Sequence, residues 1–176
     1  MEYEINGYIT VEELRNTVTL PSMERMRKGP VAVPECPQRI PCSPCMDICP
    51  SGAITMENIN DIPVVNYDKC IGCGLCVQIC PGLAIFMVGY INGKATVTMP
   101  YEFIPVPEIN EKVILHDRKG EKVGFGTVKS VLSSENVGNT TVITVEIPKE
   151  LIWDTRHISR INATEDDRKT RGDDGK

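Results

Sequence analysis

The chain has 176 residues and a net charge of −5, which suits one or two small domains. The acidic balance offers no basic surface for nucleic acid, and no apolar run approaches the roughly 18 residues that a membrane span requires. We therefore expect neither nucleic-acid binding nor membrane insertion. The N-terminus has neither the basic region nor the apolar stretch of a secretory signal, so the chain is expected to be cytoplasmic, with its cysteines not engaged in disulfides.

Residues 1–30 are predicted to be an N-terminal helical docking segment with two short helices. Thr10 and Glu13 have the spacing of a capping box, in which each side chain bonds the backbone of the other residue at the start of a helix. A second helix is predicted over residues 23–28, before the stop signal Gly29-Pro30. Neither helix carries residues suited to chemistry, so the segment is assigned to docking.

Two runs of cysteines follow within residues 31–99, and together they use all eight cysteines of the chain. The first run, residues 36–50, has the spacing Cys-x5-Cys-x2-Cys-x3-Cys-Pro, and the second, residues 70–81, has Cys-x2-Cys-x2-Cys-x3-Cys-Pro. The runs superpose at an offset of 31 residues except at their first cysteine, because the first loop is three residues longer upstream. This offset predicts an internal duplication.

The spacing is typical of two cubic iron–sulfur clusters in which the fourth cysteine of each run ligates the other cluster. We assign one cluster, called cluster I, to Cys36, Cys42, Cys45 and Cys80. The other, called cluster II, is assigned to Cys49, Cys70, Cys73 and Cys76. Zinc is the alternative, but a tetrahedral zinc site favours two Cys-x2-Cys pairs separated by a loop, and this chain instead repeats three or four cysteines before a proline.

The residues between the cysteines differ between the two runs. Gly72 and Gly74 allow backbone amides to approach cluster II closely. In the first run Pro37, Pro41 and Pro44 each remove a backbone donor near cluster I. Hydrogen bonds to cluster sulfur stabilise the more negative reduced form, so we expect unequal reduction potentials, with the lower one at cluster I.

The cysteine pattern resembles bacterial-type ferredoxins with two [4Fe-4S] clusters over residues 31–90. Residues 27–45, 80–86 and 100–108 also resemble small iron–sulfur subunits of multi-subunit FAD-dependent amino-acid dehydrogenases of the proline, hydroxyproline or opine type. This resemblance implies a metal-binding electron-transfer subunit of a hetero-oligomeric oxidoreductase complex. Electrons would pass between a flavin, FAD or FMN, in a flavoprotein partner and an external acceptor. The alternative is an independent soluble ferredoxin-type carrier.

The charge pattern favours the subunit over the carrier. Residues 70–93 contain no charged side chain, whereas a freely diffusing ferredoxin is expected to keep surface charge for solubility and steering. This stretch is therefore expected to be covered, either by other parts of the chain or, as we favour, by a partner subunit. No nucleophile–base pair, phosphate loop or dinucleotide motif is present, so no catalytic residue is predicted.

The predicted fold class is α+β, a duplicated two-cluster ferredoxin-like module followed by a small antiparallel β-barrel-like domain. Module strands are expected at residues 31–34, 54–57, 64–67 and 84–91, the last turning back through the hairpin signal Asn92-Gly93 into 95–99. Residues 100–161 form the predicted β-domain, with strands at 113–115, 123–132, 140–147 and near 155–161.

A proline-rich connector opens the predicted β-domain. Prolines exclude helix from residues 100–107, and the side chains of Tyr101, Phe103 and Ile104 are candidate apolar anchors for a partner. Packing of these three side chains within the chain is the alternative. Residues 162–176 are dominated by charged side chains and are expected to be a mobile tail.

Overall fold

The computed structural model describes residues 3–134 and 138–161, and the predicted tail at 162–176 lies outside them. The α-helices lie in the N-terminal part and the cysteine runs: α1 Tyr3–Asn6, α2 Val11–Thr17, α3 Met23–Arg27, α4 Pro44–Asp47 and α5 Leu75–Ile79. The 3-10 helix η1, Lys149–Leu151, lies in the C-terminal part. The strands are β1 Val31–Pro34, β2 Ile54–Thr55, β3 Val64–Val65, β4 Ile85–Ile91, β5 Lys94–Tyr101, β6 Lys112–His116, β7 Lys122–Ser134, β8 Gly138–Glu146 and β9 His157–Arg160. In the part of the chain so described, no helix is long and apolar enough to cross a membrane.

Both predicted N-terminal helices are confirmed, and the short α1 precedes them. At the start of α2 the Glu13 N–H donates to Thr10 Oγ1 at 3.1 Å, and the Thr10 N–H donates to Glu13 Oε2 at 3.0 Å. The predicted capping box is therefore present. Helix α3 begins after Ser22, whose hydroxyl accepts the N–H of Arg25 at 3.1 Å.

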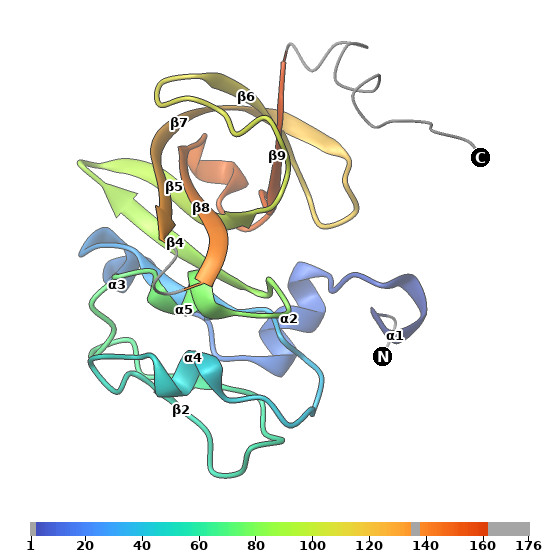
Figure 1. The fold of residues 1–176 in the computed structure, drawn as a ribbon, viewed down its shortest axis with the longest axis vertical. Coiled ribbons are helices and arrows are strands. Elements are labelled where there is room, and N and C mark those ends of the chain that lie inside the picture. Colours follow the sequence, from blue (N-terminus) through green and yellow to red (C-terminus); the bar gives the residue numbers. More distant parts are fainter. Residues whose placement is uncertain (1–2, 135–137, 162–176) are drawn as a thin grey trace.

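Seven strands form one antiparallel sheet in the order β1-β4-β5-β8-β7-β6-β9, and β2 pairs with β3 in a separate two-stranded sheet. Figure 1 shows the large sheet curling around the upper part of the molecule, with α4, α5 and β2 below it. The predicted hairpin between β4 and β5 is confirmed, since Asn92 and Gly93 have φ values of 50° and 75°, as its turn requires.

Strand β5 crosses the predicted boundary at residue 100. It pairs with β8 as far as Tyr101, and Pro100 lies opposite Val142. A proline fits here because the β4–β5 pairing already ends at Met87 and Thr98, so the missing N–H interrupts no bond on that side. The large sheet is thus continuous from the cysteine-bearing part into the C-terminal part.

This extension of β5 corrects one of the three predicted docking anchors. Tyr101 is only 5% exposed because it packs into the core, so it is not available to a partner. Phe103 and Ile104 follow the strand and are 52% and 87% exposed. These two side chains remain available.

The larger hydrophobic core joins the N-terminal, the cysteine-bearing and the C-terminal parts of the chain. Its members include Leu14 of α2, Met26 of α3, Val88 of β4 and Ile143 of β8, each almost completely buried. A second cluster of buried side chains lies around the cysteines and includes Ala32, Ile54 and Val77. The cysteine-bearing part therefore packs against both its N-terminal and its C-terminal neighbours in sequence.

Candidate functional site

The offset of 31 residues in sequence is also an offset in local structure. Helices α4 and α5 occupy equivalent positions after the second cysteine of each run, and α4 packs against α5. Beyond each helix the fourth cysteine accepts the same hydrogen bond: the Ala53 N–H donates to Cys49 Sγ at 3.3 Å, and the Ala84 N–H donates to Cys80 Sγ at 3.4 Å. The sequence repeat thus produces the same turn twice, in which a backbone N–H donates to the sulfur of the fourth cysteine.

One cavity collects four cysteines from both runs. Cys49 of the first run lines it together with Cys70, Cys73 and Cys76 of the second. The cavity is also lined by the small or apolar side chains of Ala32, Ala53, Ile54 and Met87 and by two glycines of the second run. These four thiols are the set predicted for cluster II.

Glycine is required where the second run bends around this cavity. Gly72 has a φ of 74°, and a Cβ there would lie 2.7 Å from the Pro30 carbonyl oxygen. Both the left-handed backbone and the close contact exclude other residues. Gly74, with a φ of 77°, then starts α5, which carries Cys76.

The thiols predicted for cluster I also interact with one another. Burial, followed by electrostatic repulsion from Cys80 and Cys42, raises the pKa of Cys36. The same causes raise the pKa of Cys45 to about 11. Repulsion of this kind acts only between nearby groups, so the structure brings Cys80 of the second run to the three thiols of the first.

Cys76 connects the two groups of cysteines. Burial raises its pKa to about 12, and repulsion from Cys73 and Cys70 and then from Cys45 and Cys49 adds to this effect. Since Cys45 belongs to the set predicted for cluster I, the two sets are close neighbours. Two clusters held by them would be adjacent, which is the arrangement that electron transfer between them needs.

Cys49 has the opposite shift. Burial raises its pKa, but hydrogen bonds from the Ile54 N–H, the Ser51 hydroxyl and the Ala53 and Ser51 N–H groups together lower it below its usual value. Such donors stabilise a thiolate and, in the same positions, the sulfur of a cluster ligand. The turn after the first run is therefore suited to a metal-bound sulfur.

The donor sets fit iron–sulfur clusters better than single metal ions. Among residues 3–134 and 138–161 no three His, Cys, Asp or Glu side chains converge closely enough to hold one ion. A cubane spreads its four thiolates more widely, because each binds a different iron atom. Burial and mutual repulsion raise the pKa values of Cys36, Cys45 and Cys76, so these thiols favour the protonated form unless a cation is bound, and the iron of a cluster would supply that charge.

Residues 63–86 match the family of 4Fe-4S binding domains. The matched stretch contains the whole second run of cysteines. No curated protein and no solved structure matches the chain. The chain thus contains a ferredoxin-type iron–sulfur domain that binds a [4Fe-4S] cluster and has a role in electron transfer.

The surface beside this 4Fe-4S binding domain is uncharged. Cys73 is exposed, and the neighbouring Ile71 is 67% exposed. A groove next to Cys73 runs between α5 and the strands β4, β5, β7 and β8, and none of the described residues that line it carries a charge. Leu132, at 60% exposure, and Ile91, at 41%, form part of its apolar wall.

Two groups of charged residues, which sequence reasoning missed, hold the first cysteine of each run. Arg25 donates to the carbonyl oxygen of Cys70 at 2.6 Å. Glu35, directly before Cys36, forms buried ion pairs with Arg118 and Arg156 at 2.6 and 2.7 Å. The only signal in the sequence is a carboxylate inside the otherwise apolar segment before Cys36, and it does not reveal its distant partners.

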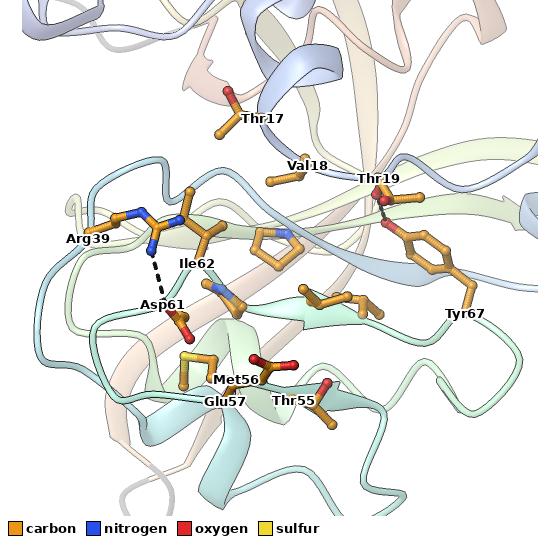
Figure 2. Close-up of a pocket in the computed structure, with 14 residues that line it drawn as sticks. Thr17, Val18, Thr19, Arg39, Thr55, Met56, Glu57, Asp61, Ile62 and Tyr67 are labelled. Atoms are coloured by element: carbon orange, nitrogen blue, oxygen red, sulfur yellow. Dashed lines mark hydrogen bonds and ion pairs between the residues drawn. The ribbon is translucent and has the colours of Figure 1, made fainter.

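A separate pocket lies between the end of α2 and the β2–β3 hairpin, and it contains no cysteine (Figure 2). Arg39, from the first cysteine loop, forms an ion pair with Asp61 at 3.0 Å across its edge. On the other side the Tyr67 hydroxyl donates to the Thr19 carbonyl oxygen at 2.6 Å. These contacts fasten the loop between Cys36 and Cys42 and the N-terminal segment around the cluster sites.

Proposed function

We propose that the chain is the electron-transfer subunit of an oxidoreductase complex and carries two [4Fe-4S] clusters. Cluster I would be held by Cys36, Cys42, Cys45 and Cys80, and cluster II by Cys49, Cys70, Cys73 and Cys76. The observation that carries this proposal is the cavity in which Cys49 of the first run joins three cysteines of the second. The mutual repulsion of Cys36, Cys42, Cys45 and Cys80 supports the complementary set.

The proposed partner is a flavin-containing dehydrogenase subunit in the same cytoplasmic complex. The flavin, FAD or FMN, belongs to that partner, and this chain contributes no catalytic residue. Electrons leaving a two-electron donor one at a time would pass through the adjacent clusters to an external acceptor. The proximity of Cys45 and Cys76 supports transfer between the clusters within the chain.

The partner is proposed to cover the uncharged groove beside Cys73. An apolar surface with an exposed cluster ligand favours a permanent subunit interface over a steered, transient encounter, which relies on charge. Leu132 and Ile71 would be buried there, while the exposed Phe103 and Ile104 are a second contact region. Exchange of Leu132 for Asp should release the partner, whereas Lys122→Asp, on the same strand outside the groove, should not.

Iron analysis and purification test the proposal together. Protein prepared without oxygen should contain about eight iron and eight sulfide per chain, because each cubane holds four of each. It should co-elute with a flavoprotein when produced in its native host. About four iron per chain, or zinc, would contradict the two-cluster assignment, and a stable brown monomer would favour the independent carrier.

A further inference from the structure

Each predicted cluster has an arginine site beside the first cysteine of its run, and the arginines come from outside the cysteine runs. At cluster II, Arg25 of α3 donates to three carbonyl oxygens: those of Cys70 at 2.6 Å, Tyr67 at 2.7 Å and Gly29 at 3.1 Å. Within residues 3–134 and 138–161 no carboxylate pairs with it. Among these residues the guanidinium of Arg25 therefore contacts the carbonyl oxygen of Cys70 without a carboxylate in an ion pair with it.

The site at cluster I is a buried triad of Glu35, Arg118 and Arg156. Glu35 Oε1 and Oε2 accept from Arg118 at 2.6 and 2.8 Å, and Oε1 also accepts from Arg156 at 2.7 Å. The three side chains are only 5%, 9% and 3% exposed. One carboxylate thus pairs with two guanidinium groups, which leaves one positive charge within the triad, and attraction from the nearby Asp154 offsets part of it at Arg156.

The hydrogen-bond geometry supports this charge assignment. Arg118 donates to both carboxylate oxygens of Glu35, as a guanidinium does to an ionised carboxylate. Burial lowers the pKa of Arg156 to about 10, which still leaves it charged at neutral pH. Arg156 Nη2 is buried and finds no acceptor among the described residues, so the donors of Arg156 are not all used by Glu35 and the backbone.

The triad is tied to the cluster I ligands by the backbone. Glu35 is bonded covalently to Cys36, and its N–H donates to the Ala84 carbonyl oxygen at 2.7 Å. The N–H of Ala84 in turn donates to Cys80 Sγ. The Arg156 guanidinium lies 5.1 Å from the ring centre of Phe86, two residues farther along.

We propose that these two arginine sites set the reduction potentials of the two clusters separately, the triad acting on cluster I and Arg25 on cluster II. The proposal rests on the two-cluster function proposed above. A reduced cluster carries one more negative charge than an oxidised one, so a nearby positive charge favours reduction and raises the potential. The triad should have the larger effect because it is better shielded from solvent than Arg25.

Exchanging charges in the triad tests the effect on cluster I. Arg118→Gln removes the excess positive charge and should lower the midpoint potential of cluster I, whereas Glu35→Gln increases the positive charge and should raise it. The double variant E35Q/R118Q has the original net charge and should return the potential to near the wild-type value. The midpoints are measured by anaerobic redox titration followed by electron paramagnetic resonance, with each signal assigned through Cys42→Ala and Cys73→Ala.

A purely structural role for the triad gives a different pattern. Shifts of the same sign for the two single variants, or a double variant displaced at least as far as either one, would overturn the proposal. If Glu35→Gln does not fold, Arg118→Lys replaces it: this variant keeps the charge and should keep the potential. Equal shifts in R118K and R118Q would then overturn the proposal.

Variants of Arg25 test the effect on cluster II, with the potential of cluster I as the control. Arg25→Gln should lower the potential of cluster II and leave cluster I unchanged, and Arg25→Lys should leave both near the wild-type values. Arg160→Gln, at the end of β9 and in an ion pair with Glu111 just before β6, should shift neither cluster. Unchanged potentials in all triad and Arg25 variants would overturn the inference even if iron analysis finds two clusters, so its failure is separable from failure of the proposed function.

Discussion

The two cysteine runs share their local backbone structure but differ in the strands that follow them and in the arginines that contact them. Both place a short helix after the second cysteine and a sulfur-binding turn after the fourth. The first run then enters β2, which pairs with β3 in the small sheet, whereas the second enters β4, which pairs with β1 and β5 in the large sheet. The first loop is held at Glu35 by arginines of the C-terminal part, and the second at Cys70 by Arg25 of the N-terminal part.

This difference indicates that ligand geometry and cluster properties have separate origins. The spacing of the cysteines determines which thiols meet, and the spacing is nearly the same in both runs. Charge, burial and hydrogen bonding come from segments outside the repeat, which are different for each run. A duplicated motif can in this way provide two clusters with unequal behaviour.

The largest effect is expected from removing an exchanged ligand. Cys80→Ala should abolish cluster I although it lies in the second run, and Cys49→Ala should abolish cluster II although it lies in the first. Iron content and electron paramagnetic resonance of each variant measure this. Loss of the cluster within the mutated run would show that each run serves its own cluster.

Breaking the support of the first run should cost the most stability. Glu35→Ala leaves the buried guanidinium groups of Arg118 and Arg156 without the carboxylate that pairs with both, which typically costs about 3–5 kcal/mol. Arg39→Ala removes the exposed pair with Asp61 from the same loop and should cost no more than about 1 kcal/mol. Denaturant unfolding of the cluster-loaded proteins compares them, and equal losses would contradict a special role for the triad.

Alanine substitutions at Gly52, just after the first run, and at Gly72, within the second, should separate the cost of a close contact from the cost of backbone strain alone. Gly52→Ala, in open space at a φ of 59°, should cost about 1–2 kcal/mol. Gly72→Ala adds the 2.7 Å contact with the Pro30 carbonyl oxygen and should cost more, with cluster II lost first on warming. Visible absorption during thermal unfolding follows this loss, and similar midpoints for both variants would contradict the tighter fit at Gly72.

The smallest effect concerns the resting potentials of the two clusters. The prolines of the first loop predict a lower potential at cluster I, although the Gln38 N–H does donate to the Cys36 thiol. The triad opposes this difference, so Arg118→Gln should widen the separation between the two midpoints. Indistinguishable midpoint potentials in the wild-type protein would contradict the predicted difference between the clusters. A higher midpoint potential at cluster I than at cluster II would show that the predicted direction is wrong.

Local features were predictable from the sequence, and long-range ones were not. The capping box at Thr10, the hairpin at Asn92-Gly93 and strand β1 depend on neighbouring residues, and all three are confirmed. The joining of strands from both parts into one sheet depends on the pairing of β5 with β8, for which the sequence contains no local signal. The burial of Tyr101 follows from that pairing.

The candidate site also has a part that the sequence predicts and a part that it does not. The spacing of the eight cysteines can be recognised in the sequence. Their predicted grouping into two ligand sets follows because, with this spacing, the fourth cysteine of each run ligates the other cluster. Arg118 and Arg156 are 83 and 121 residues from Glu35, and no spacing rule connects residues so far apart. Only the folded chain shows that they meet beside Cys36.

The wide sequence separation within the triad has a consequence for the order in which the protein is made. Cys49, Cys70, Cys73, Cys76 and Arg25 all lie in the first half of the chain, so a ribosome releases every part of the cluster II site early in synthesis. The cluster I site has all its cysteines by then, but Glu35 obtains both of its counter-ions only after Arg156 has emerged. The charged surroundings of the proposed cluster I would therefore be complete only after those of the proposed cluster II.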